Sequence, residues 1–514
     1  MLIFLFTGCK TRLAIPNFDT NTMSLSPTKI GFEITGEAVD NSFGYSVNTA
    51  GDINGDGYDD ILVGAYKKNG SRGAVYVIYG GRTFSFSNLD LGSLKLDPAT
   101  TGFVILGVPS DGLSAFGEML GCSVSTAGDI NKDGYDDIIL GAYFHKTGKG
   151  AAYVIYGGPT SSFSNIDLVS QPLNPAKTGF TVKGASFPGW LGYSVSTAGD
   201  INKDGYDDII IGAPSSGGFP GNVYVIYGGE KSSFSNIDFS VQALNPATTG
   251  FMITTATSSW VDDSSFGWSV STAGDINKDG YDDILIGATG YSDQGAAYVI
   301  YGGEKSSLGN MVLTTTPLDP ATTGFKITSI SYSAFIGYSV SSAGDINKDG
   351  YDDIIVGDMN RGEVYVIYGG KKSSLQNLAL SPTTLDPAAT GFSIIASVLG
   401  RSVSRAGDVN GDGFDDIILG AGDKDFRRGE AYVIYGGPKS KLMNIKIESM
   451  TTKTGFILTG SQGGDYFGAS VNTAGDINKD GYDDLIIGGY GVQSMKGKVS
   501  VFHSGTLQRG LNIL

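Results

Sequence analysis

The apolar residues of this chain fall into short runs that recur along its whole length. In the first repeat, Ile61–Val63 is apolar on consecutive residues, which favours a strand buried on both faces. A Tyr-rich run, Val75–Gly81, follows it, and two shorter apolar segments, Gly31–Gly36 and Phe43–Val47, precede it. None of the four segments has the 3.6-residue period of a helix. The pattern therefore predicts four short strands in each repeat.

An acidic string of nearly constant sequence separates these strands in every repeat. It reads GDINGDGYDDILVGA from Gly51 to Ala65 and returns at Gly128, Gly199, Gly274, Gly344, Gly407 and Gly475. The first aspartates of successive copies are 63 to 77 residues apart. Four strands in each of seven units predict an all-β fold, a seven-bladed β-propeller with four-stranded antiparallel blades. An open β-solenoid is the alternative, although its repeats are usually much shorter.

Composition and charge narrow the class of protein further. Glycine accounts for 78 of 514 residues and hydrophobic residues for 40%, which favours a large core with many tight turns and excludes disorder. The formal charge is −17 and no basic stripe is visible, so nucleic acid is not an expected partner. Two cysteines, Cys9 and Cys122, exclude a disulfide framework and a Cys-rich zinc site.

Each acidic string presents oxygen atoms at a spacing that suits one hard cation. Across Asp52–Asp60, oxygen-bearing side chains stand at positions 1, 3, 5 and 9, a backbone carbonyl lies near position 7, and Gly57 permits the sharp turn. Ca²⁺ takes about six to eight oxygen ligands, whereas Mg²⁺ keeps its waters and a strict octahedron. We therefore predict up to seven bound Ca²⁺ ions. The alternative is a metal-free Asp-Gly turn, in which the crowded carboxylates would repel one another.

The first six positions also match the calcium loop of an EF-hand, but the twelfth residue excludes that motif. An EF-hand needs a glutamate there, whereas these loops carry Val63, Leu140, Ile211, Ile286, Val356, Leu419 and Ile487. The predicted metal ligands, with position 7 contributing its backbone carbonyl, are Asp52, Asn54, Asp56, Tyr58, Asp60; Asp129, Asn131, Asp133, Tyr135, Asp137; Asp200, Asn202, Asp204, Tyr206, Asp208; Asp275, Asn277, Asp279, Tyr281, Asp283; Asp345, Asn347, Asp349, Tyr351, Asp353; Asp408, Asn410, Asp412, Phe414, Asp416; and Asp476, Asn478, Asp480, Tyr482, Asp484.

A Phe-Gly pair, the acidic loop and a Gly-Ala-Pro sequence recur in this order, as in Phe43–Gly44 and Gly212–Pro214. The pattern resembles the FG-GAP repeat, which builds the seven-bladed propeller of integrin α chains and of many bacterial surface proteins. The resemblance covers about residues 30–505. It implies the same metal ligands at positions 1, 3, 5 and 9 of each loop. Departures from Phe-Gly in four repeats and from Gly-Ala in two do not touch those ligands.

The resemblance also implies how the ring closes. In the family, the Gly-Phe strand is the outer edge of the preceding blade. The first such segment, Gly31–Gly36, has no preceding blade, and the last repeat stops after Val499–Phe502 without an outer strand. We therefore expect the N-terminal strand to close the last blade, with Phe32–Thr35 antiparallel to Lys498–Phe502.

The N-terminal run Met1–Cys9 is apolar and ends in a small residue before a cysteine. It is too short for a membrane span, which needs about 20 residues, and it resembles the signal of a bacterial lipoprotein; the alternative is a hydrophobic N-terminus without that role. We expect lipidation at Cys9 and an extracytoplasmic location at the bacterial envelope or surface, with membrane contact only through that anchor. The expected organisation is a signal over residues 1–9, a linker over 10–29, the propeller over 30–505 and a tail over 506–514.

The resemblance implies that two sets of loops lie on the face opposite the metal, and their sequences differ between repeats, so we expect a protein or glycan ligand to bind there. Exposed aromatic residues are favoured binding anchors, although each could instead pack its own loop. These loops carry Phe144, Phe187, Trp190, Phe219, Trp260, Tyr291, Tyr332 and Phe335, of which the candidate ligand-binding residues are Trp190, Trp260, Tyr291 and Phe335.

We therefore predict a monomeric, calcium-binding, cell-surface propeller that acts in adhesion or binds a protein ligand. Lectin-like carbohydrate binding is the alternative. An enzyme is disfavoured, because the sequence contains no G-x-S-x-G elbow, zinc signature or glycine-rich phosphate loop.

Overall fold

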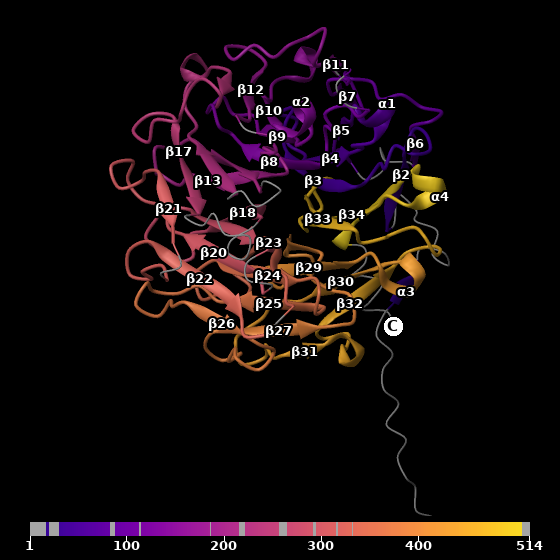
Figure 1. Cartoon of the computed structure of the whole chain (residues 1–514). Coiled ribbons are helices and arrows are strands. Elements are labelled where there is room, and N and C mark those ends of the chain that lie inside the picture. The colour runs from indigo at the N-terminus through magenta and orange to yellow at the C-terminus, as the bar shows by residue number, and fades with distance from the viewer. Residues whose placement is uncertain are drawn as a thin grey trace, which may run out of the picture.

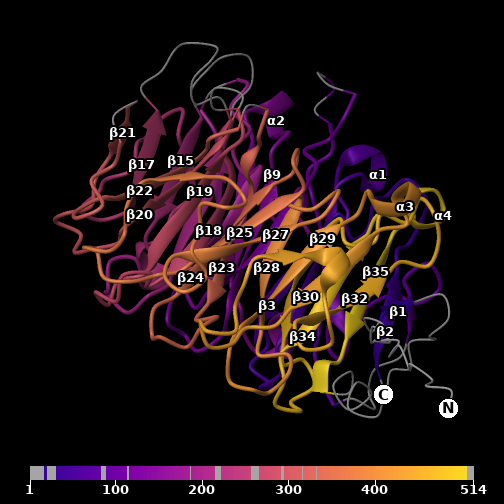
Figure 2. The same ribbon diagram turned by 90° about the horizontal axis from the view of Figure 1, so that it is seen from below.

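The chain forms seven separate β-sheets arranged around a central axis (Figure 1). The structure is a computed structural model that describes residues 17–19, 30–82, 88–110, 112, 115–185, 187–214, 221–255, 265–290, 294–314, 317–331 and 333–505. Seen from the side, the sheets stand next to one another as the blades of a propeller (Figure 2). The predicted all-β, seven-bladed propeller is confirmed.

Blade 1 shows how each repeat folds. Its innermost strand is β3 (Ser46–Gly51), followed outward by β4 (Asp60–Gly64), β5 (Ala74–Ile78) and β7 (Gly102–Leu106), each antiparallel to its neighbour. Every residue of β4 and β5 is buried, because both faces of the sheet pack against neighbouring blades. The outermost of these strands, β7, is the Gly-Phe segment of the next repeat, as the sequence predicted.

The other six blades repeat this order of four antiparallel strands. From the axis outward they are β8 (Ser123–Gly128), β9 (Asp137–Ala142), β10 (Ala151–Ile155) and β12 (Gly179–Lys183) in blade 2; β13 (Ser194–Gly199), β14 (Asp208–Ala213), β15 (Asn222–Ile226) and β17 (Gly250–Thr255) in blade 3; β18 (Phe266–Gly274), β19 (Asp283–Ala288), β20 (Ala296–Ile300) and β22 (Gly324–Ser329) in blade 4; β23 (Ile336–Gly344), β24 (Asp353–Asp358), β25 (Glu363–Ile367) and β27 (Gly391–Ile395) in blade 5; β28 (Ser402–Gly407), β29 (Asp416–Ala421), β30 (Glu430–Ile434) and β32 (Gly455–Thr459) in blade 6; and β33 (Ser470–Gly475), β34 (Asp484–Gly489), β35 (Lys498–Phe502) and β2 (Gly31–Thr35) in blade 7.

A fifth, short strand pairs in parallel with the outer edge of every blade, which corrects the predicted four strands. In order from blade 1 to blade 7, these strands are β11 (Ile166–Asp167), β16 (Ile237–Asp238), β21 (Met311–Leu313), β26 (Leu378–Leu380), β31 (Ile445–Lys446), β1 (Asn17–Asp19) and β6 (Leu89–Asp90). Two or three residues are too few to show an alternating pattern, so the sequence gives no signal for them.

In the part of the chain that the structure describes, single helical turns connect the second and third strands of blades 1, 2, 6 and 7. They are α1 (Lys68–Ser71), α2 (His145–Gly148), α3 (Lys424–Arg427) and α4 (Val492–Met495). Among the described residues, short 3₁₀ turns also lie further out in the repeats, at Thr160–Ser162, Lys231–Ser233 and Ile447–Ser449. Such short elements are set by loop geometry rather than by helical periodicity, which is why the sequence did not predict them.

The N-terminal strand closes the ring as predicted. Strand β2 runs antiparallel to β35, with Phe32 opposite Val501 and Thr35 opposite Lys498. The side chains of Lys498 and Glu33 form an ion pair at 2.8 Å across this seam. Strand β2 near the start of the chain and β35, the last described strand, therefore belong to one sheet.

The chain contributes its first described strand, β1 (Asn17–Asp19), to blade 6, whereas the first strand was expected in blade 7. Strand β1 lies within the predicted linker and pairs in parallel with β32 of blade 6, with Phe18 opposite Leu458 (Figure 2). The Phe18 ring is buried and meets Phe456 edge-on, with ring centroids 5.8 Å apart. The N-terminal segment thus contributes strands to two neighbouring blades.

The apolar core lies between the blades. Each of seven buried clusters combines side chains from two neighbouring blades, and the cluster between blades 7 and 1 includes Phe32, Ile34, Ile61 and Val63. Close packing also needs glycine at the inner strands, since a Cβ atom at Gly64 would lie 2.2 Å from the carbonyl oxygen of Gly121 in blade 2. A single repeat could not bury these faces alone.

Candidate metal loops and ligand-binding face

Each acidic string forms the turn between the first and second strands of a blade. In blade 2, the carboxylate of Asp129 accepts hydrogen bonds from the backbone N–H groups of Asp133 at 3.0 Å and Gly134 at 2.9 Å. The Asp133 carboxylate accepts one from the N–H of Tyr135 at 3.2 Å. The same three bonds recur in the other six loops. The carboxylate at position 1 therefore organises the turn.

The carboxylate at position 9 is buried at the base of each loop. In blade 2, Asp137 is fully buried, and it accepts hydrogen bonds from Asn131 Nδ2 at 2.7 Å and from the N–H of Gly157 at 2.8 Å. Burial raises the pKa of Asp137 well above its usual range, against the smaller opposing effect of the Gly157 N–H. A buried carboxylate is costly unless a positive charge compensates it. The other position-9 residues are equally buried: Asp60, Asp208, Asp283, Asp353, Asp416 and Asp484.

Blade 7 differs at this point because a histidine reaches its position-9 carboxylate. His503 Nδ1 lies 3.2 Å from Asp484 Oδ2, and the two side chains are fully buried. Burial raises the pKa of Asp484 to about 6, and the contact with His503 works in the opposite direction. The residue after the third strand of blade 7, β35, is thus a basic group where the other copies have a tyrosine.

The side-chain oxygen of the asparagine at position 3 indicates whether a cation fits the loop. In five loops its Oδ1 atom is buried and has no hydrogen-bond donor: those of Asn131, Asn202, Asn277, Asn347 and Asn478. In the other two loops, position 4 is glycine, and Asn54 and Asn410 accept a bond from the position-5 N–H at 2.9 Å. A buried amide oxygen without a donor is costly, and a hard cation would satisfy it.

The donor set as a whole suits Ca²⁺, which prefers carboxylate, amide and backbone oxygens. Within the described residues, no three Asp, Glu, His or Cys side chains come close enough to hold a metal ion by themselves. A Ca²⁺ ion would therefore need the asparagine and the position-7 carbonyl as well as the aspartates. The residues present at positions 1, 3, 5, 7 and 9 fit this requirement.

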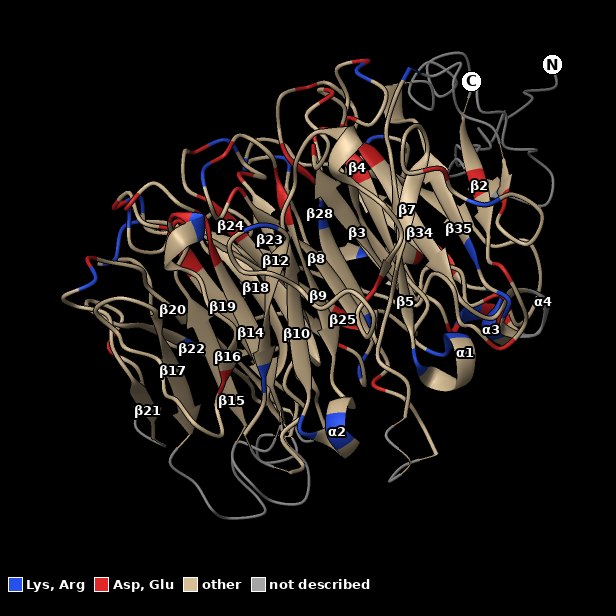
Figure 3. Cartoon of the chain, turned by 90° about the horizontal axis from the view of Figure 1, so that it is seen from above, with Lys and Arg blue, Asp and Glu red and all other residues tan. Residues whose placement is uncertain are grey.

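The loops of neighbouring blades are tied to one another. The position-8 carboxylate of each blade accepts a hydrogen bond from the position-1 N–H of the preceding blade, as between Asp136 and Asp52 at 2.8 Å. Asp59 and Asp476 make the same contact at 2.9 Å and complete the circle. Six of the seven position-8 carboxylates, all except that of Asp415, line a cavity of about 610 Å³ on the ring axis. Figure 3 shows the acidic residues gathered along this edge of the ring.

The side chain at position 7 covers the neighbouring loop, while its backbone remains available as a predicted ligand. Lys132 at position 4 has a left-handed φ of 57°, and its Nζ lies 5.6 Å from the ring centre of Tyr206 in the next blade. Lys479 makes the equivalent contact with Tyr58 at 5.2 Å. This contact gives the aromatic residue at position 7 a structural role between loops.

Two of the four predicted ligand-binding aromatics, Trp190 and Phe335, are described, and no described ring contact brings them together. Trp190 is half-buried and stacks on Tyr193, with ring centroids 6.1 Å apart, and it also meets Tyr143 edge-on at 6.1 Å. Phe335 is 37% exposed, and among the described ring contacts none joins it to Trp190. Trp260 and Tyr291 lie outside the described residues, as does Cys9.

An aromatic rim that the sequence analysis did not single out surrounds the other mouth of the ring. Tyr45 directly precedes β3, whereas the metal loop follows this strand, so the two lie at opposite ends of it. The rim residues follow either the glycine of the Phe-Gly pair or the end of the second strand, and all are half-buried: Tyr45, Tyr66, Tyr143, Tyr193, Trp268, Tyr338 and Tyr490. A comparison of these two positions across the seven copies would have revealed them.

The rim is continuous over several blades. Tyr45 lies 4.4 Å from Tyr66 and 5.5 Å from Tyr490 between ring centroids. Trp268 similarly lies 4.6 Å from Tyr193 and 5.6 Å from Tyr338. Arg401 occupies the corresponding position in blade 6 and forms an ion pair with Asp423 at 2.9 Å. This face therefore offers aromatic rings and one guanidinium, a combination enriched where proteins bind partners.

A buried carboxylate beneath this face gives a pH-dependent prediction. Asp358 is fully buried and accepts a hydrogen bond from the N–H of Phe335 at 2.8 Å. Burial raises its pKa, so the folded state disfavours the charged form, and the resulting loss of stability is present at neutral pH and absent below about pH 4. The variant Asp358→Asn keeps the acceptor but not the charge. Its stability relative to the parent should therefore be greater at pH 7 than at pH 4.

Urea unfolding of both proteins at the two pH values measures this difference. Any cost of burying the amide itself is the same at both pH values and cancels. An equal relative stability at pH 7 and pH 4 would contradict the prediction.

Comparison with known proteins agrees with the geometry. The FG-GAP repeat matches residues 43–78, 123–155, 191–226, 266–300, 336–367, 399–435 and 467–502, one segment in each repeat. Integrin alpha pat-2 of Caenorhabditis elegans is 30% identical over 257 residues, which are 48% of this chain and 19% of that protein. Integrin alpha-PS2 of Drosophila melanogaster is 32% identical over 188 residues, 36% of this chain and 12% of that protein.

A longer match joins the chain to integrin alpha-5 of Xenopus laevis, with 29% identity over 324 residues, which are 57% of this chain and 27% of that protein. The chain thus spans no more than about a quarter of these relatives. In the described residues, no helix is long and apolar enough to cross a bilayer. Seven matching segments on seven blades show that the chain belongs to the FG-GAP repeat family, with a propeller similar to those of integrin α chains.

Proposed function

We propose that this propeller is a calcium-binding adhesion module that binds a protein ligand on its aromatic rim outside the cell. The observation that carries the proposal is the rim itself, in which rings such as Tyr45, Trp268 and Tyr338 remain half-buried at one mouth of the ring. Aromatic side chains dominate the energetics of protein interfaces. The similarity to integrin α chains supports an adhesive and extracellular role.

In this proposal, bound Ca²⁺ stabilises the acidic loops on the face opposite the aromatic rim. We propose one Ca²⁺ per loop, bound through positions 1, 3, 5, 7 and 9, because five asparagine oxygens have no hydrogen-bond donor and six of the seven buried position-9 carboxylates have no described ion-pair partner, Asp484 with His503 being the exception. The ion would supply charge compensation and would cross-link the start of the turn to its end. Extracellular fluid provides Ca²⁺ at the concentration such loops need, which is about 10⁻⁴–10⁻³ M.

The function is tested by binding assays on the purified, calcium-loaded chain. We expect it to bind at least one member of a panel of purified extracellular matrix proteins. Trp268→Ala should weaken that binding by about 2 kcal/mol, or roughly thirtyfold, as loss of an aromatic anchor does. Val241→Ala, which truncates an 81% exposed side chain outside the rim, is the matched control. Binding unchanged by Trp268→Ala would contradict a role for the rim.

A glycan array distinguishes lectin-like carbohydrate binding, the second candidate function, from binding to a protein ligand. Lectin-like binding would give glycan signals that depend on both calcium and Trp268, without binding to unglycosylated proteins.

We also propose export with lipidation at Cys9 in a bacterial host. A native N-terminal peptide that retains unmodified Met1 in mass spectrometry would contradict that anchor.

The calcium loops should differ in affinity, because lysines compete for the position-5 ligand in four of them. Lys231, Lys305, Lys372 and Lys439 form ion pairs at 2.5–2.8 Å with Asp133, Asp204, Asp279 and Asp349 of the preceding blade. All four lysine side chains are about one-third exposed, so each pair contributes only about 0.2–1 kcal/mol. Replacing the four lysines by methionine should therefore tighten Ca²⁺ binding by about 1.4- to fivefold at these four loops.

Calorimetric titration with Ca²⁺ measures this change. The matched control replaces four exposed lysines for which no ion pair is described, Lys177, Lys371, Lys441 and Lys453, and makes the same change in net charge. An equal gain in both variants would mean that net charge, and not competition for position 5, sets the affinity.

A further inference from the structure

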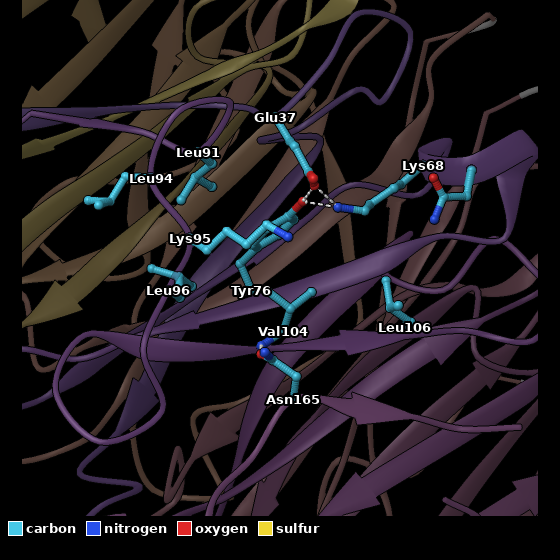
Figure 4. A pocket seen from close by; sticks show the side chains of 11 residues that line it. Glu37, Lys68, Tyr76, Leu91, Leu94, Lys95, Leu96, Val104, Leu106 and Asn165 are labelled. Carbon is cyan, nitrogen blue, oxygen red and sulfur yellow. Dashed lines mark hydrogen bonds and ion pairs between the residues drawn. The ribbon is translucent and has the colours of Figure 1, made fainter. Parts of the chain in front are cut away.

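A cavity of about 290 Å³ lies at the outer edge of the ring between blades 7 and 1 (Figure 4). Its walls are aliphatic: Leu91, Leu94 and Leu96 follow β6, and Val104 and Leu106 belong to β7. Leu94 is 50% exposed at its rim. The volume is near the lower limit of the pockets that bind small molecules, so its occupant would be small.

The polar part of the cavity is built around a buried lysine. Lys68 in α1 is 7% exposed, and its ammonium group donates a hydrogen bond to the Tyr76 hydroxyl at 2.7 Å and forms an ion pair with Glu37. The Tyr76 hydroxyl in turn donates to Glu37 at 3.1 Å. An ammonium group has three N–H donors, and these contacts use two of them. The third can serve a ligand in the cavity.

The charges around the cavity favour an anion, in contrast to the chain as a whole. Lys68 and the exposed Lys95 contribute two positive charges to its lining, and Glu37 contributes one negative charge. The lining is thus positive by one charge, although the formal charge of the whole chain is −17. A single carboxylate would neutralise this excess.

Blade 3 shows that the fold does not require such a cavity. There Phe239 follows β16 as Leu91 follows β6, and Tyr224 in β15 corresponds to Tyr76 in β5. The Phe239 ring stacks on Tyr224 with centroids 4.1 Å apart and ring planes 14° from parallel. An aromatic ring therefore covers this tyrosine in blade 3, whereas Leu91 leaves space beside Tyr76.

We propose that the cavity binds a short aliphatic carboxylate of about six carbon atoms. Its carboxylate accepts a hydrogen bond from Lys68, and its hydrocarbon part packs against Leu91, Val104 and Leu106. A molecule of this size has eight heavy atoms, and it fits a volume of roughly ten liquid-water molecules at about 30 Å³ each. This site is distinct from the metal loops and from the aromatic rim.

Isothermal titration of the calcium-loaded chain with 4-methylpentanoate tests the proposal. We expect saturable binding of one molecule per chain. The neutral analogue 4-methylpentanamide should bind at least tenfold more weakly, because a charge-assisted hydrogen bond to Lys68 is replaced by a neutral one. Leu91→Phe, which introduces the residue found in blade 3, and Lys68→Met should each reduce affinity at least tenfold.

The reciprocal variant Phe239→Leu is the control and should leave the affinity of the blade 1 site unchanged. Thermal melting of every variant verifies that the propeller remains folded. Three results would each overturn the proposal: no saturable heat up to about 10 mM carboxylate, equal affinity for the acid and the amide, or full binding by folded Leu91→Phe.

Discussion

Deletion of residues 1–37 is expected to destabilise the whole propeller. It removes β1 and β2, and with β2 it removes Phe32 and Ile34, which are at most 1% exposed. Truncating a buried phenylalanine costs about 3–5 kcal/mol and a buried isoleucine about 2–5 kcal/mol. The sum is comparable with the total stability of a typical domain, about 5–15 kcal/mol. We therefore expect the truncated chain to be unfolded or to melt far below the full chain.

Two shorter deletions make this prediction specific. Deletion of residues 1–16 keeps both strands and should leave the melting temperature nearly unchanged. Deletion of residues 1–29 removes only β1 and with it the contact between Phe18 and Phe456, so an intermediate loss is expected. Circular dichroism melting of the three chains gives the order. Equal stability of the 1–16 and 1–37 deletions would contradict a role for the seam between β2 and β35.

Removal of calcium is expected to have the other large effect. Each site stabilises the folded state by RT ln(1 + [Ca²⁺]/Kd), which is about 1.4 kcal/mol at ten times Kd. Seven such sites together contribute about 10 kcal/mol. Scanning calorimetry should therefore show a large fall in the melting temperature on chelation and recovery with Ca²⁺.

Mg²⁺ at the same concentration is the ionic control and should restore little of the loss, because it prefers to keep its own waters. Asp133→Ala should remove about one-seventh of the calcium-dependent stabilisation, since it alters one loop only. A melting temperature that is the same with and without chelator would contradict calcium binding.

Much of the fold could be predicted because the repeat is long, regular and nearly invariant. Seven copies gave the blade number, and the position of Gly31–Gly36 ahead of the first copy gave the closure that β2 and β35 show. The fifth strands could not be predicted, because segments such as Ile166–Asp167 are set by pairing alone. Strand β1 offers one apolar residue, Phe18, and its partner strand lies in the sixth blade.

Of the two faces of the candidate site, the metal loops could be predicted from the sequence, whereas the aromatic rim could not. Spacing within one loop was enough to place the oxygen atoms of Asp129, Asn131 and Asp137 around a single turn. The aromatic rim uses at most two residues from each repeat, and its rings meet only across blades, as Trp268 meets Tyr193. Sequence differences between the loops and their aromatic content highlighted Trp190 and Phe335 instead; Trp190 contacts two rim residues, Tyr143 and Tyr193, whereas Phe335 has no described ring contact with the rim.

The pairing of β2 with β35 also determines how late in biosynthesis the propeller can close. Phe32 pairs with Val501, so a ribosome that adds about 5–20 residues per second needs roughly 25 to 95 s between them. Throughout this interval the edge of β2 that later pairs with β35 has no partner strand, a state that favours aggregation. The N-terminal segment therefore has to be shielded until the last blade has emerged, and the ring can lock only after translation has reached its final strand.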